Sequence, residues 1–147
     1  MDNPAVRTVQ HVSYEAAVQA MAAGLDKARE LGINVGIVVT DANGDIVTAA
    51  RMDGANPRAW KGGQGKAHAA AGFGRSTEEF IEKRLKDDEV LWRAMSGNPD
   101  TFLVPGGVAL TVNGKSVGAV GVSGGHYTDD AKVAQAAADK FAELIAE

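Results

Sequence analysis

Two of the three histidines in this chain are the side chains best suited to chemistry. His68 lies in an alanine-rich segment, two residues after Lys66. A neutral imidazole can coordinate a metal centre or move a proton as a general base, because its ordinary pKa lies near neutrality. The alternative is a polar side chain on the solvent face of a helix. His11 lies in a polar N-terminal segment, and we interpret it as simply exposed.

His126 directly follows Gly124-Gly125 and precedes the last predicted helix. Backbone N–H groups and the positive end of the helix dipole favour an anion there, so His126 is either a contact for a carboxylate or a polar loop residue. Gly106-Gly107 is a second glycine pair. We interpret both pairs as places where the backbone closely approaches a ligand or a neighbouring subunit. Neither pair has the spacing of a nucleotide-binding loop.

Arg51 and Asp53 leave a predicted strand together, in the sequence Arg-Met-Asp-Gly. The arginine fork suits two hydrogen bonds to a carboxylate, and the aspartate could orient the arginine or accept a proton. The alternative is structural, in which the pair closes the end of a hairpin or forms an ion pair between subunits.

The composition excludes several functional classes. There is no cysteine, so disulfides, thiolate metal sites and a cysteine nucleophile are excluded. The formal net charge is -4, with acidic and basic residues interspersed, so neither nucleic acid nor an anionic membrane is an expected partner. A small molecule or a protein is favoured. The first residues contain no signal peptide or apolar span, so we expect a cytoplasmic protein unless a signal peptide was removed.

Periodicity and turn residues predict the elements that must position these side chains. A helix is expected over 13–31, with Ser13 capping its start and Gly32 its end. Two strands, 34–40 and 45–51, flank Asn43-Gly44, a strong hairpin signal. Pro57 and Gly62-Gly63 indicate a loop before a short helix over 66–73.

The second half of the chain repeats this alternation of helices and a hairpin. Ser76 and Glu79 form a capping box that opens a helix to about residue 85, and 88–94 add a further turn or two. A second hairpin pairs 108–112 with 115–122. Thr128 is expected to cap the last helix, with Asp129 and Asp130 in its first turn. These elements predict one α+β domain over 1–147, an antiparallel sheet with helices on both faces.

Several motifs resemble the GlcG/HbpS-like (DUF336) family. The stretch from Val38 to Val47, followed by Arg51 to Ala55, is similar to the family's first hairpin. Three further segments are similar in order and spacing: GKAHAA at 65–70, PGGV at 105–108 and VGAVGVSGG at 117–125. The resemblance implies a profilin-like α-β-α sandwich that forms homo-oligomers, often octamers. It also implies haem binding, found in several members, or a place beside cobalamin or glycolate metabolism.

Two hypotheses follow from the resemblance and the residues together. In the first, the protein binds haem or a related tetrapyrrole between subunits, with His68 or His126 near the iron. In the second, a cofactor-independent isomerase, tautomerase or lyase acts on a small catabolic carboxylate. Arg51 would then hold the carboxylate and His68 would move a proton, with Lys66 or Asp53 adjusting its pKa.

Other features bear on this choice. His68 and the run His126-Tyr127-Thr128 depart from the family's usual residues, which favours a changed chemistry. A purely accessory subunit is the third possibility. The apolar strands of the second hairpin would expose a flat surface unless something covers them, so we expect a homo-oligomer.

Overall fold

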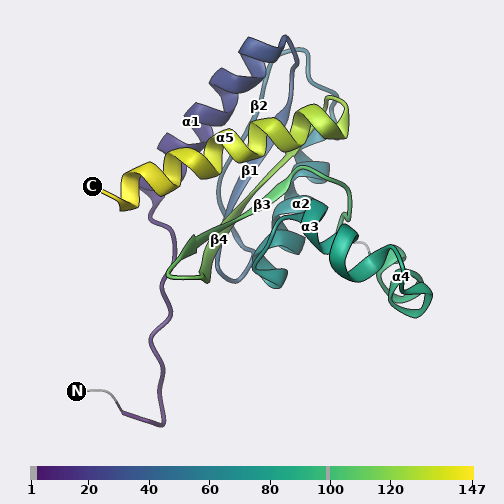
Figure 1. Ribbon diagram of the computed structural model, residues 1–147. Coiled ribbons are helices and arrows are strands. Elements are labelled where there is room, and N and C mark those ends of the chain that lie inside the picture. The colour runs from purple at the N-terminus through teal and green to yellow at the C-terminus, as the bar shows by residue number, and fades with distance from the viewer. Residues whose placement is uncertain (1–2, 99) are drawn as a thin grey trace.

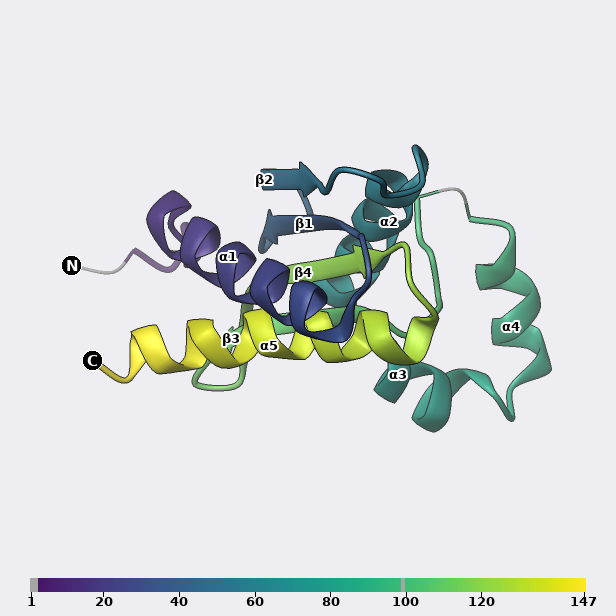
Figure 2. The same ribbon diagram turned by 90° about the horizontal axis from the view of Figure 1, so that it is seen from above.

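The computed structural model describes residues 3–98 and 100–147, and its elements alternate helices with two hairpins. In chain order they are α1 (Tyr14–Leu31), β1 (Gly36–Asp41), β2 (Ile46–Arg51), α2 (Ala59–Phe73), α3 (Thr77–Phe80), the π-helix η1 (Ile81–Leu85), α4 (Glu89–Ser96), β3 (Gly107–Val112), β4 (Lys115–Ser123) and α5 (Tyr127–Ile145). The strands form one antiparallel sheet in the order β2-β1-β4-β3. Helices α1 and α5 cover one face and α2 covers the other (Figures 1 and 2). The predicted α+β sandwich is confirmed.

The first helix and hairpin follow the sequence closely. The Ser13 hydroxyl accepts a hydrogen bond from the Ala16 N–H, and Gly32 ends α1 with φ 71°. Successive side chains of β1 point to opposite faces of the sheet. Ile37 packs into the core beneath α1 and α5, and Val38 packs against α2. The strand is therefore buried on both faces.

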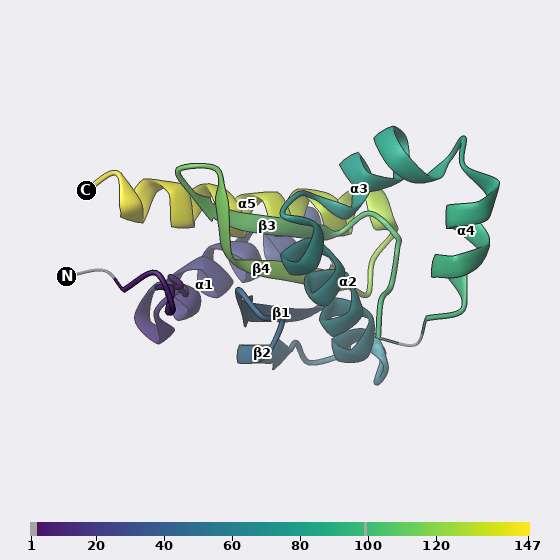
Figure 3. The same cartoon turned by 90° about the horizontal axis from the view of Figure 1, so that it is seen from below.

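Helix α2 begins earlier than predicted. Gly62-Gly63 was expected in a loop, but both residues lie inside α2. The physical reason is close packing, since a Cβ on Gly63 would come within 2.9 Å of the Gly121 carbonyl oxygen of β4. Glycine costs helix stability, but here it lets the helix lie directly on the sheet (Figure 3).

The start of α5 also differs from the prediction. His126, not Thr128, is the N-cap residue, and its Nδ1 accepts a hydrogen bond from the Thr128 N–H at 3.3 Å. A histidine nitrogen thus replaces the hydroxyl that sequence statistics favour at this position.

Strand β4 of the apolar second hairpin is covered within the chain and does not expose the flat surface that we expected, whereas the edge strand β3 stays partly exposed at Val108, Ala109 and Val112. Strand β4 is central in the sheet, and Val117, Val120 and Val122 are buried. Exposed apolar side chains occur on several elements, including Tyr14, Ile46 and Ile145, and two of them lie on α4, where Val90 is 80% and Trp92 53% exposed. Helix α4 projects from the body of the protein (Figure 1). Within 3–98 and 100–147, no helix is long and apolar enough to cross a bilayer.

Candidate functional site

The outer face of α2 lines two adjoining hollows, which we call the α2 groove. The first hollow has a volume of about 630 Å³ and the second about 700 Å³, and they share Lys61 and Gly65. Volumes of this size suit small ligands. Lys61, Gly65 and His68 recur at helical spacing, so they lie along one face of the helix. The other lining residues are Gly44, Asp45, Ile46, Gln64, His68 and Asp100 in the first hollow, and Asn56, Arg58, Ala59, Gly62, Ser96, Asn98, Thr101, Phe102, Ser123, Gly124 and Gly125 in the second.

His68 occupies one end of the groove and is exposed. Its Nδ1 edge lies against Gly44 in the β1–β2 turn, where a Cβ would be only 2.6 Å from Nδ1. Of the two ring nitrogens, Nε2 is therefore the one farther from the turn. A neutral imidazole held in this way can offer Nε2 to a metal centre.

The other end of the groove is cationic and partly aromatic. Arg58, the N-cap residue of α2, and Phe102, from the segment before β3, line this end, and Lys61 lines both hollows. The Lys61 ammonium lies 5.9 Å from the ring centroid of Trp60, a cation–π contact. Within the described part of the chain, Arg58 and Lys61 have no ion-pair partner. These cations are available to a carboxylate-bearing ligand.

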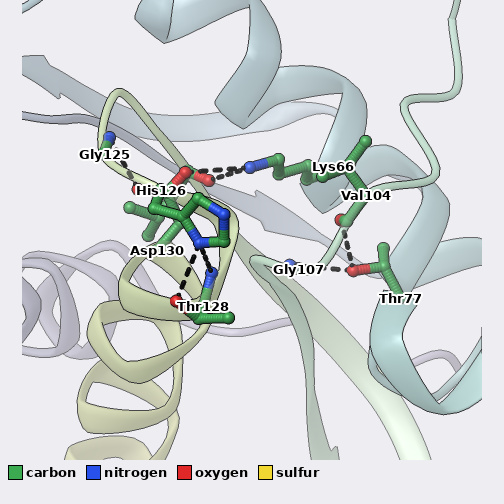
Figure 4. Close-up of polar contacts among 9 residues, drawn as sticks. Lys66, Thr77, Val104, Gly107, Gly125, His126, Thr128 and Asp130 are labelled. Carbon is green, nitrogen blue, oxygen red and sulfur yellow. Dashed lines mark hydrogen bonds and ion pairs between the residues drawn. The ribbon is translucent and has the colours of Figure 1, made fainter.

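Lys66 points the opposite way and is buried in an ion pair with Asp130 (Figure 4). The Lys66 Nζ lies 3.2 Å from Asp130 Oδ2 and donates to the Val122 carbonyl at 2.8 Å. Burial lowers the pKa of Lys66 and raises the pKa of Asp130, while the attraction between the two charges opposes both shifts. Lys66 therefore faces the interior, away from the groove that His68 lines.

Both glycine pairs are explained by contacts within the chain. A Cβ on Gly106 would lie 2.9 Å from Lys66 Nζ, and one on Gly124 would lie 2.7 Å from the Asn34 carbonyl oxygen. Gly124-Gly125 nevertheless line the α2 groove. Gly106-Gly107 line a separate hollow of about 430 Å³ beside the start of α5. The structure thus divides the two pairs between different hollows.

Arg51 and Asp53 are not brought near His68. They line a hollow of about 440 Å³ with Arg29 of α1. His68 contacts the turn that precedes β2, whereas Arg51 is the last residue of that strand. At about 3.3 Å per residue, the strand separates these positions by roughly 16 Å. A small carboxylate cannot contact Arg51 and His68 of one subunit together.

Comparison with known proteins identifies the family. The chain matches the family described as "Haem degrading protein HbpS-like" over residues 12–139. It belongs to the HbpS-like family. Protein GlcG of Escherichia coli is 34% identical over 118 residues, which are 80% of this chain and 85% of GlcG. The crystal structure of ORFY from Klebsiella pneumoniae is 29% identical, covers 97% of both chains and gives a TM-score of 0.85. The structure of a PduOC–haem complex shares the fold at 24% identity and a TM-score of 0.79, with 88% of this chain and 94% of PduOC covered.

Sequence reasoning missed several site residues of this HbpS-like chain. Asp130 was interpreted only as a helix-dipole residue, and Arg58, Lys61 and Phe102 were not considered. One signal for Asp130 was present, because Lys66 lies among alanines on a helix and a buried lysine needs a carboxylate partner. His126 is exposed and caps α5, and its ring lies 4.1 Å from that of Tyr127, centroid to centroid, with the two planes tilted by 33°.

Proposed function

We propose that this HbpS-like protein binds haem or a related tetrapyrrole in the α2 groove, with His68 as the iron ligand. One observation carries the proposal: a single groove along α2 has an imidazole at one end, an arginine and an aromatic ring at the other, and a lysine that lines both hollows. Haem needs this set of groups, because it combines a metal, an apolar ring system and two propionate carboxylates.

Each group has a separate role in this proposal. His68 Nε2 would coordinate the iron, which supplies the ligand's redox chemistry when bound. Arg58 and Lys61 would hold the propionates, the arginine through two parallel hydrogen bonds. Phe102 would contact the apolar ring. The family's description as haem-degrading and the solved PduOC–haem complex support haem as the ligand class.

A homo-oligomer forms part of the same proposal. Each hollow of the groove is open to solvent in a single subunit, so a second subunit would close it over the ligand. The exposed apolar side chains of α4 provide surface for such a contact. Light scattering at micromolar concentration tests this point, and a strict monomer would contradict it.

The binding proposal is tested by titrating hemin into the purified protein and following the Soret band. The wild type should bind saturably, and His68→Ala should shift the band and weaken binding. His126→Asn is the matched control, because asparagine preserves the helix cap and removes the other candidate ligand. An unsaturable titration would refute haem binding, and a shift only in His126→Asn would refute His68 as ligand.

The cationic end is tested separately with Arg58→Gln/Lys61→Gln. We expect weaker hemin binding with an unchanged Soret position, because the iron ligand is intact. The difference from wild type should shrink as salt is added, since the contact is electrostatic. If this variant and the wild type bind hemin with equal affinity, Arg58 and Lys61 do not hold the propionates.

A further inference from the structure

The Lys66–Asp130 ion pair lies directly behind the wall of the α2 groove. It joins α2 to α5 across 64 residues of sequence, and the two side chains are only 1% and 2% exposed. Burying two charges costs roughly several kcal/mol per ion, and replacing such a pair by apolar residues of similar volume is often neutral or stabilising. A buried ion pair is therefore weak evidence for a purely stabilising role.

The remaining hydrogen bonds of the pair lead to the groove wall. Asp130 Oδ1 accepts from the Gly125 N–H at 2.9 Å, and Gly125 lines the groove. Lys66 Nζ donates to the Val122 carbonyl, directly before Ser123, which also lines the groove. Figure 4 shows both side chains meeting beside the turn that holds Gly125. One wall of the groove is therefore fixed to the pair.

Phe102, which lines the same hollow, also lies close to this lysine. Lys66 Nζ lies 5.6 Å from the ring centroid of Phe102. The Phe102 N–H donates at 3.2 Å to the carbonyl of Gly65, the residue before Lys66. The buried Lys66 ammonium is thus linked to the Gly124-Gly125 turn through Asp130, and it also lies close to the Phe102 ring.

We propose that Lys66 and Asp130 are positioning residues that set the separation between Phe102 and the Gly124-Gly125 turn, which line the same hollow of the groove. This inference rests on the proposed function for its consequence, ligand affinity, but not for its geometry. Hydrogen bonds and ion pairs fix direction as well as distance, whereas an apolar pair would fill the space without holding the Gly125 amide or the Val122 carbonyl.

The test uses the double variant Lys66→Met/Asp130→Asn, in which neither charge is left unpaired. Asparagine keeps an oxygen for the Gly125 N–H, and methionine approximates the lysine stem. Lys27→Met/Glu30→Gln is the matched control, because it removes a solvent-exposed ion pair from α1. Two quantities are measured: backbone residual dipolar couplings of residues 101–103 and 123–125 without ligand, and the Kd for hemin.

We expect the couplings of both segments to change in the double variant and not in the control. Hemin affinity should fall about tenfold or more, the size that outer-shell partners contribute at metal sites. A folded double variant with wild-type couplings and wild-type affinity would overturn the proposal. If this variant does not fold, Lys66→Arg is measured in the same way, since it keeps the charge and moves the contact points. Wild-type couplings together with wild-type hemin affinity in Lys66→Arg would likewise overturn the proposal.

The two proposals fail in different ways. If wild-type protein does not bind hemin saturably, haem binding is wrong, and the ligand-free couplings still decide the positioning role. If wild type and double variant bind hemin equally and share the same couplings, positioning is wrong and haem binding stands.

Discussion

The two faces of helix α2 have opposite environments although they share one short sequence. Lys66 is buried against the sheet and α5, whereas His68, two residues later, is exposed in the groove. Residues two apart on a helix point in different directions, so closeness in sequence does not join these side chains. The inner face holds the fold together and the outer face is available to a ligand.

The largest effect should come from breaking the inner ion pair on one side. Lys66→Met leaves the Asp130 carboxylate buried without its cation, which should cost about 3–5 kcal/mol of unfolding free energy. Urea denaturation measures this loss. Lys86→Met removes an exposed ion pair with Glu82 and should leave the unfolding free energy nearly unchanged, because solvent screens the two charges. Equal losses in the two variants would show that burial of Lys66 has no special weight.

A smaller loss is expected where the inner face touches the sheet. A Cβ on Gly121 would overlap the Gly63 carbonyl oxygen and lie 2.5 Å from the Ala67 nitrogen. Gly121→Ala should therefore destabilise the protein by roughly 1–3 kcal/mol, because α2 must move away from β4.

Gly72→Ala is the control on the same helix. A Cβ at Gly72 would have no neighbour within 4 Å, so the substitution should stabilise by about 0.5–1 kcal/mol through helix propensity. Thermal unfolding followed by circular dichroism compares the two variants. A stable Gly121→Ala would contradict the close packing of α2 on the sheet.

A smaller effect is expected on the pH dependence of the unfolding free energy, to which the buried Lys66–Asp130 pair should contribute. Burial raises the pKa of Asp130, so its contribution to stability is present below its ordinary pKa and is lost as pH rises through the folded pKa. Burial lowers the pKa of Lys66, so its contribution is present above its ordinary pKa and is lost as pH falls through the folded pKa.

Both contributions are therefore weakest between these limits. The unfolding free energy of wild type, minus that of Lys66→Met/Asp130→Asn, should be lowest near about pH 7 and higher near about pH 4 and pH 10. Urea titrations at the three pH values measure it. A difference that does not change with pH would mean that the pair titrates alike in the folded and unfolded states.

Much of the fold could be predicted from local sequence because each signal acts locally. Ser13 and Gly32 bound α1, and Asn-Gly turns join both hairpins, as expected. The errors arose where tertiary packing outweighed propensity. Gly62-Gly63 has the composition of a loop, but contact with β4 requires glycine inside a helix.

The candidate site was harder to predict because its residues meet only in three dimensions. The pattern around His68 identified one end of the groove. Nothing local in the sequence connects Lys66 with Asp130, or places Phe102 in the same hollow as Gly124-Gly125. The side chains of Arg51 and His68 could both take part in chemistry, but the length of β2 keeps them apart. Residue type indicated what could react, and topology decided which groups could act together.

The smallest expected effect is on the outer face. His68 is exposed, and its removal leaves no buried polar group without a partner, so His68→Ala should change the unfolding free energy by no more than about 0.5 kcal/mol. Urea denaturation without ligand measures this. A loss of more than about 1 kcal/mol would mean that packing of the imidazole on Gly44 holds the β1–β2 turn to α2, and His68 would then belong with the fold-stabilising residues. A neutral result, together with altered hemin binding, would separate the binding role of this face from the stabilising role of the other.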